Sequence, residues 1–201
     1  MTAILLGLLI ASAKSFYDSQ RKEVTDMSAK VVLLDRALAI YGPETKETRE
    51  ALKRAANRVL QAIWSQDDAA NSSTAAPPAG GEMLYEKIEL LSPQNDTQRS
   101  MRTEALSLAI DLGKTRWLMF EQANSSVSLP LLVVLVFWLT TKFCSFGLLS
   151  PRTPVVVATL GLCALSVSAA VFLMVEMYNP FRGVVQVSSA PFRSALANLG
   201  K

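Results

Sequence analysis

The chain has 201 residues, half of them hydrophobic, and its 20 basic and 17 acidic residues give a formal net charge of +3. Lysine and arginine are not gathered into one basic face, which argues against a nucleic-acid-binding protein. The sequence has no histidine, no cysteine pair at ligand spacing, no nucleophile motif and no glycine-rich phosphate loop, so it predicts neither an enzyme nor a bound metal or cofactor.

The first apolar segment, Thr2 to Ala13 within residues 1–13, is too short to cross a membrane. Twelve helical residues cover about 18 Å, whereas the hydrocarbon core of a bilayer is about 30 Å thick. Three interpretations compete: a signal peptide ending at Ala11-Ser12-Ala13, an interfacial anchor, or part of a longer membrane helix. A signal peptide normally has a basic residue before its apolar core, and none is present. The helical pattern continues past Ala13, which favours a partial membrane helix.

Residues 14–128 carry most of the charges and are predicted to be a helical cytoplasmic region. Apolar residues recur at alternating steps of three and four, interrupted by Gln20, and place one stripe against a partner helix. The stripe consists of Val24, Met27, Val31, Leu34, Leu38 and Tyr41. Gly42-Pro43 ends this helix, and a second begins near Pro43 and Glu44.

The second helix and the segments after it complete a predicted antiparallel bundle. Its apolar face is Leu52, Ala55, Ala56, Val59, Leu60, Ile63 and Trp64. Residues 66–81 are small, polar or proline and predict a flexible loop. A short helix over residues 83–91 follows, and Ser92-Pro93 is interpreted as the cap and first-turn proline of a long helix reaching about residue 122. Its buried stripe is Met101, Ala105, Leu108, Leu112 and Met119.

Residues 129–178 are predicted to be a transmembrane helical hairpin. The apolar runs 129–149 and 154–178 each reach the roughly 20 residues that a spanning helix needs, and only four residues separate them. Lys142 lies inside the first run, either as a lysine that reaches toward the interface or as a cation facing an anion path or a subunit contact. Residues 179–201 are predicted to be a cytoplasmic tail whose helix-like part, 190–199, docks on the bundle.

The distribution of basic residues predicts the orientation. The loop between the two spans has one basic residue, Arg152, whereas the segments that flank the membrane helices on the other side have eight. Those eight are Lys14, Arg21, Lys22, Lys114, Arg116, Arg182, Arg193 and Lys201. The positive-inside rule then places the soluble region and the C-terminus of an integral membrane protein in the cytoplasm.

Short motifs recur along nearly the whole chain: residues 5–14, Leu33-Leu34-Asp35-Arg36, Tyr41-Gly42-Pro43-Glu44, Leu91-Ser92-Pro93, Thr115-Arg116-Trp117-Leu118, Phe137-Trp138-Leu139 and Pro180-Phe181 with Gly183. With these motifs the chain resembles the bacterial bestrophin-like domain family, membrane proteins of unknown function distantly similar to bestrophin anion channels. The resemblance implies a location in the bacterial inner membrane. Family members usually begin with one further membrane helix and a full-length second one, so it also implies an N-terminally truncated chain.

Bestrophins proper are pentameric anion channels whose pore is lined by the second membrane helix. By analogy, the resemblance implies that residues 5–14 and their continuation line a pore. Gly7, Ser12 and Ser15, with Lys142, are the candidate pore or subunit-contact residues, although close helix packing explains the three small residues equally well. The implied partners are the lipid bilayer, further copies of the chain and an inorganic anion. The alternative is a membrane-anchored helical scaffold or signalling protein without transport activity.

Overall fold

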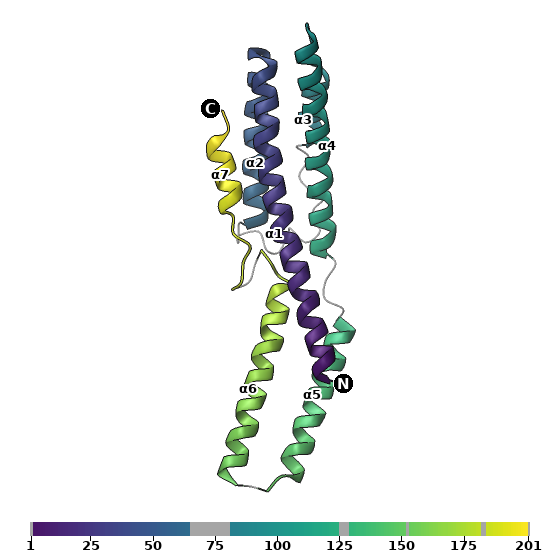
Figure 1. The fold of residues 1–201 in the computed structure, drawn as a ribbon, viewed down its shortest axis with the longest axis vertical. Coiled ribbons are helices and arrows are strands. Elements are labelled where there is room, and N and C mark those ends of the chain that lie inside the picture. Colours follow the sequence, from purple (N-terminus) through teal and green to yellow (C-terminus); the bar gives the residue numbers. More distant parts are fainter. Residues whose placement is uncertain (1, 65–80, 125–128, 152, 182–183, 201) are drawn as a thin grey trace. The chain divides into compact units, whose positions relative to one another are not determined.

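The structure is a computed structural model that describes residues 2–64, 81–124, 129–151, 153–181 and 184–200 (Figure 1). Within these ranges all the regular secondary structure is helical, which confirms the predicted all-α fold. The elements are α1 (Thr2–Tyr41), the 3₁₀ helix η1 (Pro43–Thr45), α2 (Lys46–Trp64), α3 (Gly81–Glu89), α4 (Asp96–Asn124), α5 (Leu129–Leu149), α6 (Pro154–Met177) and α7 (Ala190–Asn198). The chain folds as two compact units, one built from Met1–Ser19 and Ser125–Gln186 and the other from Gln20–Asn124 and Val187–Lys201.

The second unit is a helical bundle whose core includes the predicted stripe of α1. Each residue of that stripe is at most 4% exposed. Gln20, where the apolar pattern breaks, is buried as well. On α2, Leu52 and Ala56 are buried while the other predicted apolar positions are half-buried. The partners of the α1 stripe are therefore helices of the same chain.

The turn between α1 and α2 follows from Gly42-Pro43, as predicted. Gly42 has a φ of 142°, a conformation open to glycine and strained for other residues. The hydroxyl of Thr45 lies 2.6 Å from the carbonyl oxygen of Leu38 and 2.8 Å from that of Gly42. It therefore satisfies carbonyl groups at the end of α1, where the helix leaves them without helical partners.

The prediction that Ser92-Pro93 caps the long helix is wrong. α4 begins at Asp96, and the side-chain oxygen of Asn95 accepts a hydrogen bond from the Gln98 N–H at 2.8 Å. The Gln98 side chain in turn accepts a bond from the Gln94 N–H at 2.7 Å. This pattern resembles a capping box, and because serine and asparagine are similarly good N-cap residues, the two hydrogen bonds of Gln98 favour the start at Asn95.

The helix α3 also ends earlier than predicted, at Glu89 instead of Leu91. The guanidinium of Arg102 on α4 donates to the carbonyl oxygens of Ile88 (3.3 Å) and Glu89 (2.6 Å). An arginine at this position satisfies carbonyls that the helix end leaves free. On α4, Ala105 and Met119 are buried and the other three predicted stripe positions are half-buried. The predicted loop, 66–81, lies almost wholly outside the described residues.

The C-terminal segment docks on the bundle, as predicted. α7 packs against α2, and its buried side chains include Phe192, Ala195 and Leu196. The indole N–H of Trp64 donates to the carbonyl oxygen of Val187 at 2.9 Å, and the Trp64 and Phe192 rings lie 6.4 Å apart. Residues from both ends of this unit's sequence thus share one core.

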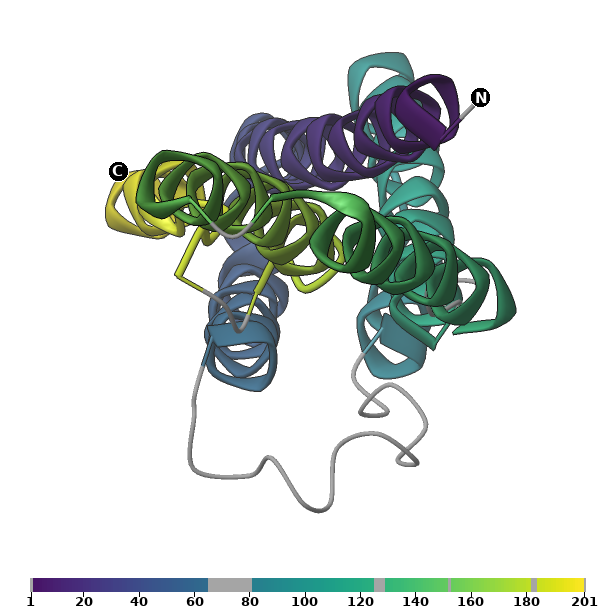
Figure 2. The ribbon, with the colours of Figure 1, turned by 90° about the horizontal axis from the view of Figure 1, so that it is seen from below.

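In the first unit, α5 and α6 pack against each other (Figure 2). Segments Leu132–Leu149 and Pro154–Met177 are long and apolar enough to cross a membrane. Only 6% of the first segment and none of the second is buried inside the structure. The predicted pair of membrane-length helices is therefore present, and most of its apolar surface faces outward. Residues 2–19 of α1 belong to the same unit, and the helix continues through Ala13 without a break.

Candidate functional site

The four candidate residues predicted from the sequence all lie in the first unit and are exposed. Gly7, Ser12 and Ser15 are on α1, and Lys142 is on α5. Ser12 lies 3.3 Å from the hydroxyl of Tyr178, which follows α6. A Cβ added at Gly7 would meet no atom within 4 Å, so no neighbouring helix of the described chain packs closely on this glycine. Among the described contacts, none joins two of these four residues.

An aromatic contact, which sequence reasoning did not anticipate, joins α1 to the chain after α6. The rings of Phe16 and Tyr178 stack with centroids 5.5 Å apart, and the Tyr17 hydroxyl donates to the Gln186 carbonyl at 3.2 Å. Together with the Ser12 contact, these interactions hold one face of α1 against Tyr178 and Gln186. A tyrosine at the end of an apolar run was the available signal, because its ring suits a packed or interfacial site and its hydroxyl needs a polar partner.

Each of the two apolar helices contains one charged residue, and the two differ in their surroundings. Lys142 on α5 is exposed. Glu176 is near the end of α6, and its carboxylate accepts a hydrogen bond from the backbone N–H of Val184. Glu176 therefore supports the turn that follows α6, whereas Lys142 is free to reach toward a membrane interface or a neighbouring molecule.

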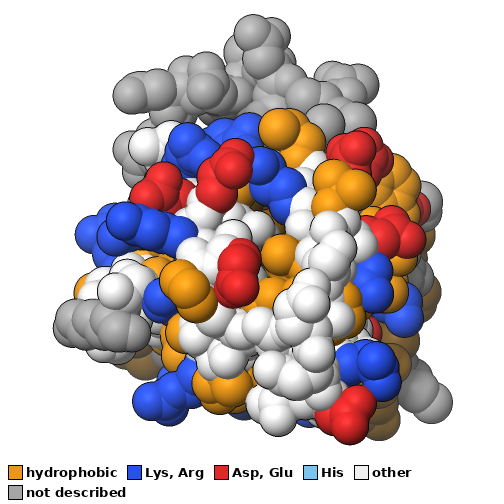
Figure 3. Space-filling view, turned by 90° about the horizontal axis from the view of Figure 1, so that it is seen from above, with side chains coloured by type: hydrophobic (Ala, Val, Ile, Leu, Met, Phe, Trp, Pro, Cys, Tyr) orange, Lys and Arg blue, Asp and Glu red, His pale blue; other side chains and the backbone are white. Residues whose placement is uncertain are grey.

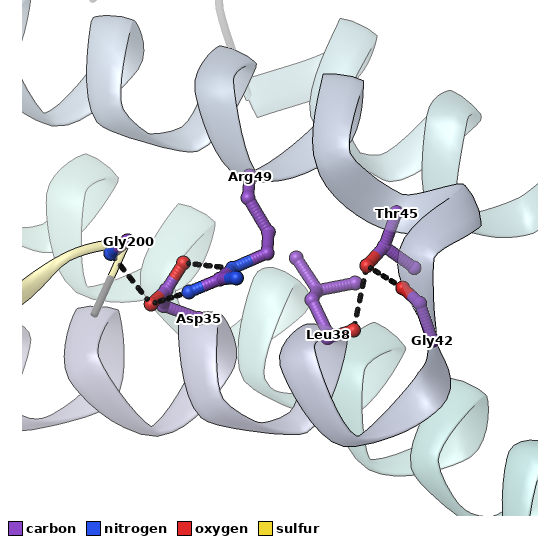
Figure 4. Close-up of polar contacts among 6 residues, drawn as sticks. All are labelled: Asp35, Leu38, Gly42, Thr45, Arg49 and Gly200. Carbon is purple, nitrogen blue, oxygen red and sulfur yellow. Dashed lines mark hydrogen bonds and ion pairs between the residues drawn. The ribbon is translucent and has the colours of Figure 1, made fainter.

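A buried polar cluster in the second unit joins α1, α2 and the chain end (Figure 4). The Arg49 guanidinium donates to both carboxylate oxygens of Asp35, at 2.7 and 2.8 Å, and the Gly200 N–H donates to the same carboxylate at 3.1 Å. The Asp35 side chain is 8% exposed and that of Arg49 is 23% exposed. A bidentate pair of this kind is among the strongest side-chain interactions in proteins.

The surroundings of Asp35 keep it ionised. Burial raises the pKa of Asp35, but hydrogen bonds from Arg49 and Gly200 and the charges of Arg49 and Lys53 outweigh burial, so its pKa lies below 3.8. A pocket of about 390 Å³ adjoins the cluster and is lined partly by Lys46 and Leu199. The paired charges satisfy each other, so this cluster is suited to holding the chain end and offers no activated nucleophile or base.

Within the described ranges, no group of three or more histidine, cysteine, aspartate or glutamate side chains is placed to hold a metal ion. On the face seen in Figure 3, basic and acidic side chains are intermixed, as expected of a solvated surface. The main candidate surface for binding a partner is the outward apolar surface of α5 and α6.

The sequence motifs acquire structural roles in this arrangement. Asp35 and Gly42 belong to two of the motifs. Asp35 provides the buried carboxylate, and Gly42 provides the turn conformation that other residues rarely adopt. Pro180, in a third motif, is buried. Arg49 could have been suspected from an arginine at the start of α2, but its pairing with Asp35 depends on how the two helices pack.

Comparison with known proteins agrees with these features. A family model described as the bestrophin-like domain matches residues 1–192. Neither the curated proteins nor the solved structures gave a match to the chain. The matched range includes α1 to α6, the Asp35–Arg49 pair and the start of α7. The chain therefore belongs to the bestrophin-like domain family.

Proposed function

We propose that this chain is a subunit of an oligomeric integral membrane protein that passes inorganic anions. The observation that carries the proposal is the outward apolar surface of α5 and α6 in a chain of the bestrophin-like family. The bilayer is the first partner in this proposal, and further copies of the chain are the second.

The membrane part of the proposal follows from the exposure of large apolar side chains. Phe137 and Trp138 on α5 are 67% and 55% exposed, and Leu162 and Leu165 on α6 are 66% and 69% exposed. Contiguous apolar surface of this extent is rare on water-soluble monomers. In lipid it carries no such penalty, and an α-helix satisfies its own backbone hydrogen bonds there.

The proposed orientation places the helical bundle and the C-terminus in the cytoplasm of a bacterial cell, with the hairpin in the inner membrane. One basic residue lies between the two spans, and eight lie in the segments that flank the membrane helices on the other side. The positive-inside rule favours this arrangement.

The proposed assembly follows from the two membrane-length helices among the described residues. A conducting path needs a ring of helices, and these two helices alone do not enclose one. Several copies would surround an axis, with the first part of α1 beside it. Gly7 and Ser15 are the better candidates for that lining, because Ser12 already contacts Tyr178.

The alternative of a scaffold dimer joined through the α1 stripe has less support. The stripe residues are buried within a single chain, so they are not available to a second one. A scaffold without transport activity would have to use another surface.

The test combines the particle mass with anion flux. The full-length protein in detergent is sized by light scattering, and chloride efflux is then measured from liposomes that contain it. We expect a ring of several subunits and a flux that falls in Gly7→Val. The matched control is Gly161→Val on α6, because a Cβ at either glycine meets no atom within 4 Å. A monomer or dimer without flux would overturn the channel proposal and favour the scaffold.

A further inference from the structure

An ion pair lies on the exposed face of the first part of α1. The Nζ atom of Lys14 is 2.8 Å from the Oδ2 atom of Asp18, and their side chains are 62% and 50% exposed. Ala13, by contrast, is fully buried and marks the face of α1 that is turned inward. Gly7, a candidate pore residue, is also exposed and lies seven residues before Lys14, so the two share a face of the helix. The ion pair and the candidate pore lining therefore belong to the same side of α1.

Contacts within the first unit place this pair beside the end of α6. The apolar segment of α6 ends one residue before Tyr178. Tyr178 contacts Ser12 and stacks on Phe16, so Lys14 lies at the level where the apolar segment ends. Asp18 lies one helical turn farther along α1, about 6 Å beyond Lys14. In the proposed orientation, this level is the cytoplasmic surface of the membrane.

We propose that Lys14 attracts anions to the cytoplasmic mouth of the proposed path and that Asp18 is its partner when no anion is bound. This inference rests on the proposed function, because it needs several copies of α1 around an axis. One lysine from each copy then forms a ring of positive charge, an arrangement that favours anions in pores. Charge at the mouth of a narrow path also raises the local concentration of the opposite ion.

The order of the two residues makes the pair easy to open. In a helix, an acid four residues before a lysine forms a better pair than the reverse order, which is the order of Lys14 and Asp18. Exposed pairs contribute little to stability, because water competes for both charges. An anion can therefore replace Asp18 as the partner of Lys14 at small cost. The carboxylate weakens the attraction of Lys14 for anions, and its removal should strengthen that attraction.

The experiment measures chloride efflux from liposomes that contain the full-length protein, and the reversal potential of the same protein in a planar bilayer under a gradient of potassium chloride. We expect Lys14→Gln to lower the chloride flux severalfold and to shift the reversal potential toward that of potassium. We expect Asp18→Asn to change both quantities in the opposite direction. The matched control is Lys53→Gln, which makes the same change in net charge at an exposed position in the other unit and should leave both unchanged.

The opposite signs separate an electrostatic role from a merely structural one. If the pair only stabilised α1, either substitution would break it, and both variants would change in the same direction. Lys14→Arg keeps the charge and should retain the flux and the selectivity of the natural protein. The differences between variants should also shrink as the ionic strength rises, because salt screens exposed charges. A structural defect would persist at high ionic strength.

The outcomes distinguish the failure of this inference from the failure of the proposed function. If the natural protein passes no chloride, the proposed function is wrong and this inference is wrong with it. If the natural protein passes chloride and Lys14→Gln keeps its flux and selectivity, the path exists but Lys14 does not act on it, so this inference alone is wrong. Changes of the same sign in Lys14→Gln and Asp18→Asn would also overturn it.

Discussion

At the scale of single residues, Asp35 is a charged side chain in a buried environment. Its carboxylate is buried, and it accepts hydrogen bonds from Arg49 and from the backbone of Gly200. Burial alone disfavours its charge, and these donors reverse that preference. The same group therefore ties two helices to the chain end and makes the stability of the bundle depend on pH.

We predict that Asp35→Asn lowers the free energy of unfolding at neutral pH by about 2 kcal/mol, because Arg49 loses its charged partner. The pKa of Asp35 is lower in the folded state, so its contribution is present above about 3.8 and is lost as the pH falls through the folded value. Denaturant unfolding of both proteins at a series of pH values measures this. Asp26→Asn, an exposed position on α1, is the control. A difference that persists undiminished at the lowest pH would contradict the mechanism.

Gly42 is the second residue whose identity follows from local geometry. Its backbone lies at φ 142° and ψ 179°, a region that is essentially restricted to glycine. We predict that Gly42→Ala destabilises the bundle by about 1 to 3 kcal/mol. Thermal or denaturant unfolding measures the loss. Gly113→Ala on α4 is the control, since an added Cβ there meets no atom within 4 Å and alanine favours a helix. Equal stability of Gly42→Ala and the natural protein would show that this turn is unstrained.

At the scale of secondary-structure elements, the short helix α7 depends on packing for its stability. Nine residues are too few to form a stable isolated helix in water. Phe192 anchors it, because this side chain is 1% exposed and lies beside Trp64. Trp64 also holds the preceding segment through its bond to Val187. α2 and α7 are therefore expected to gain and lose their structure together.

We predict that Phe192→Ala costs about 3 kcal/mol, through lost burial and the cavity left behind. Residues 187–200 should then exchange their amide hydrogens faster than the rest of the bundle. Hydrogen exchange followed by mass spectrometry measures this segment directly. Arg193→Ala changes the neighbouring exposed residue and should leave the exchange unaltered. Unchanged protection in Phe192→Ala would mean that α7 is held by other contacts.

At the scale of the whole molecule, the chain combines a bundle with a buried core and a helical pair whose apolar side chains face outward. The bundle core uses the ordinary hydrophobic effect, which requires water outside it. The outward apolar surface of α5 and α6 is long enough to cross a membrane, and the proposed function places it in lipid.

We predict that replacing Leu162 and Leu165 together by arginine prevents stable insertion of α6. Each arginine near the centre of a membrane helix costs about 3 kcal/mol on insertion scales. Extraction of membranes at alkaline pH measures whether the protein stays with the lipid. The double alanine variant at the same positions removes similar apolar area without adding charge and should remain inserted. Retention of the double arginine variant would contradict membrane insertion through this helix.

The amino-acid sequence by itself determined the helical class, the bounds of α5 and, to within one residue, those of α6, and the turn at Gly42-Pro43 that ends α1. These features depend on periodicity, on the length of apolar runs and on glycine and proline, which act over a few neighbouring residues. The start of α4 was misjudged because Ser92-Pro93 and Asn95 are competing start signals, and the reciprocal bonds of Gln98 favour the second.

The tertiary structure alone decided which surfaces meet. The periodic stripe of α1 predicts a partner helix, but it does not show whether that helix belongs to the same chain. The burial of the stripe within a single chain decides this. Asp35 pairs with Arg49, and Ser12 contacts Tyr178, so each of these contacts joins two different elements. The Nε atom of Arg116 is buried without a hydrogen-bond partner. Such contacts arise when segments distant in the sequence pack together. A local sequence pattern shows which face of a helix is apolar, but it does not show which segment covers that face.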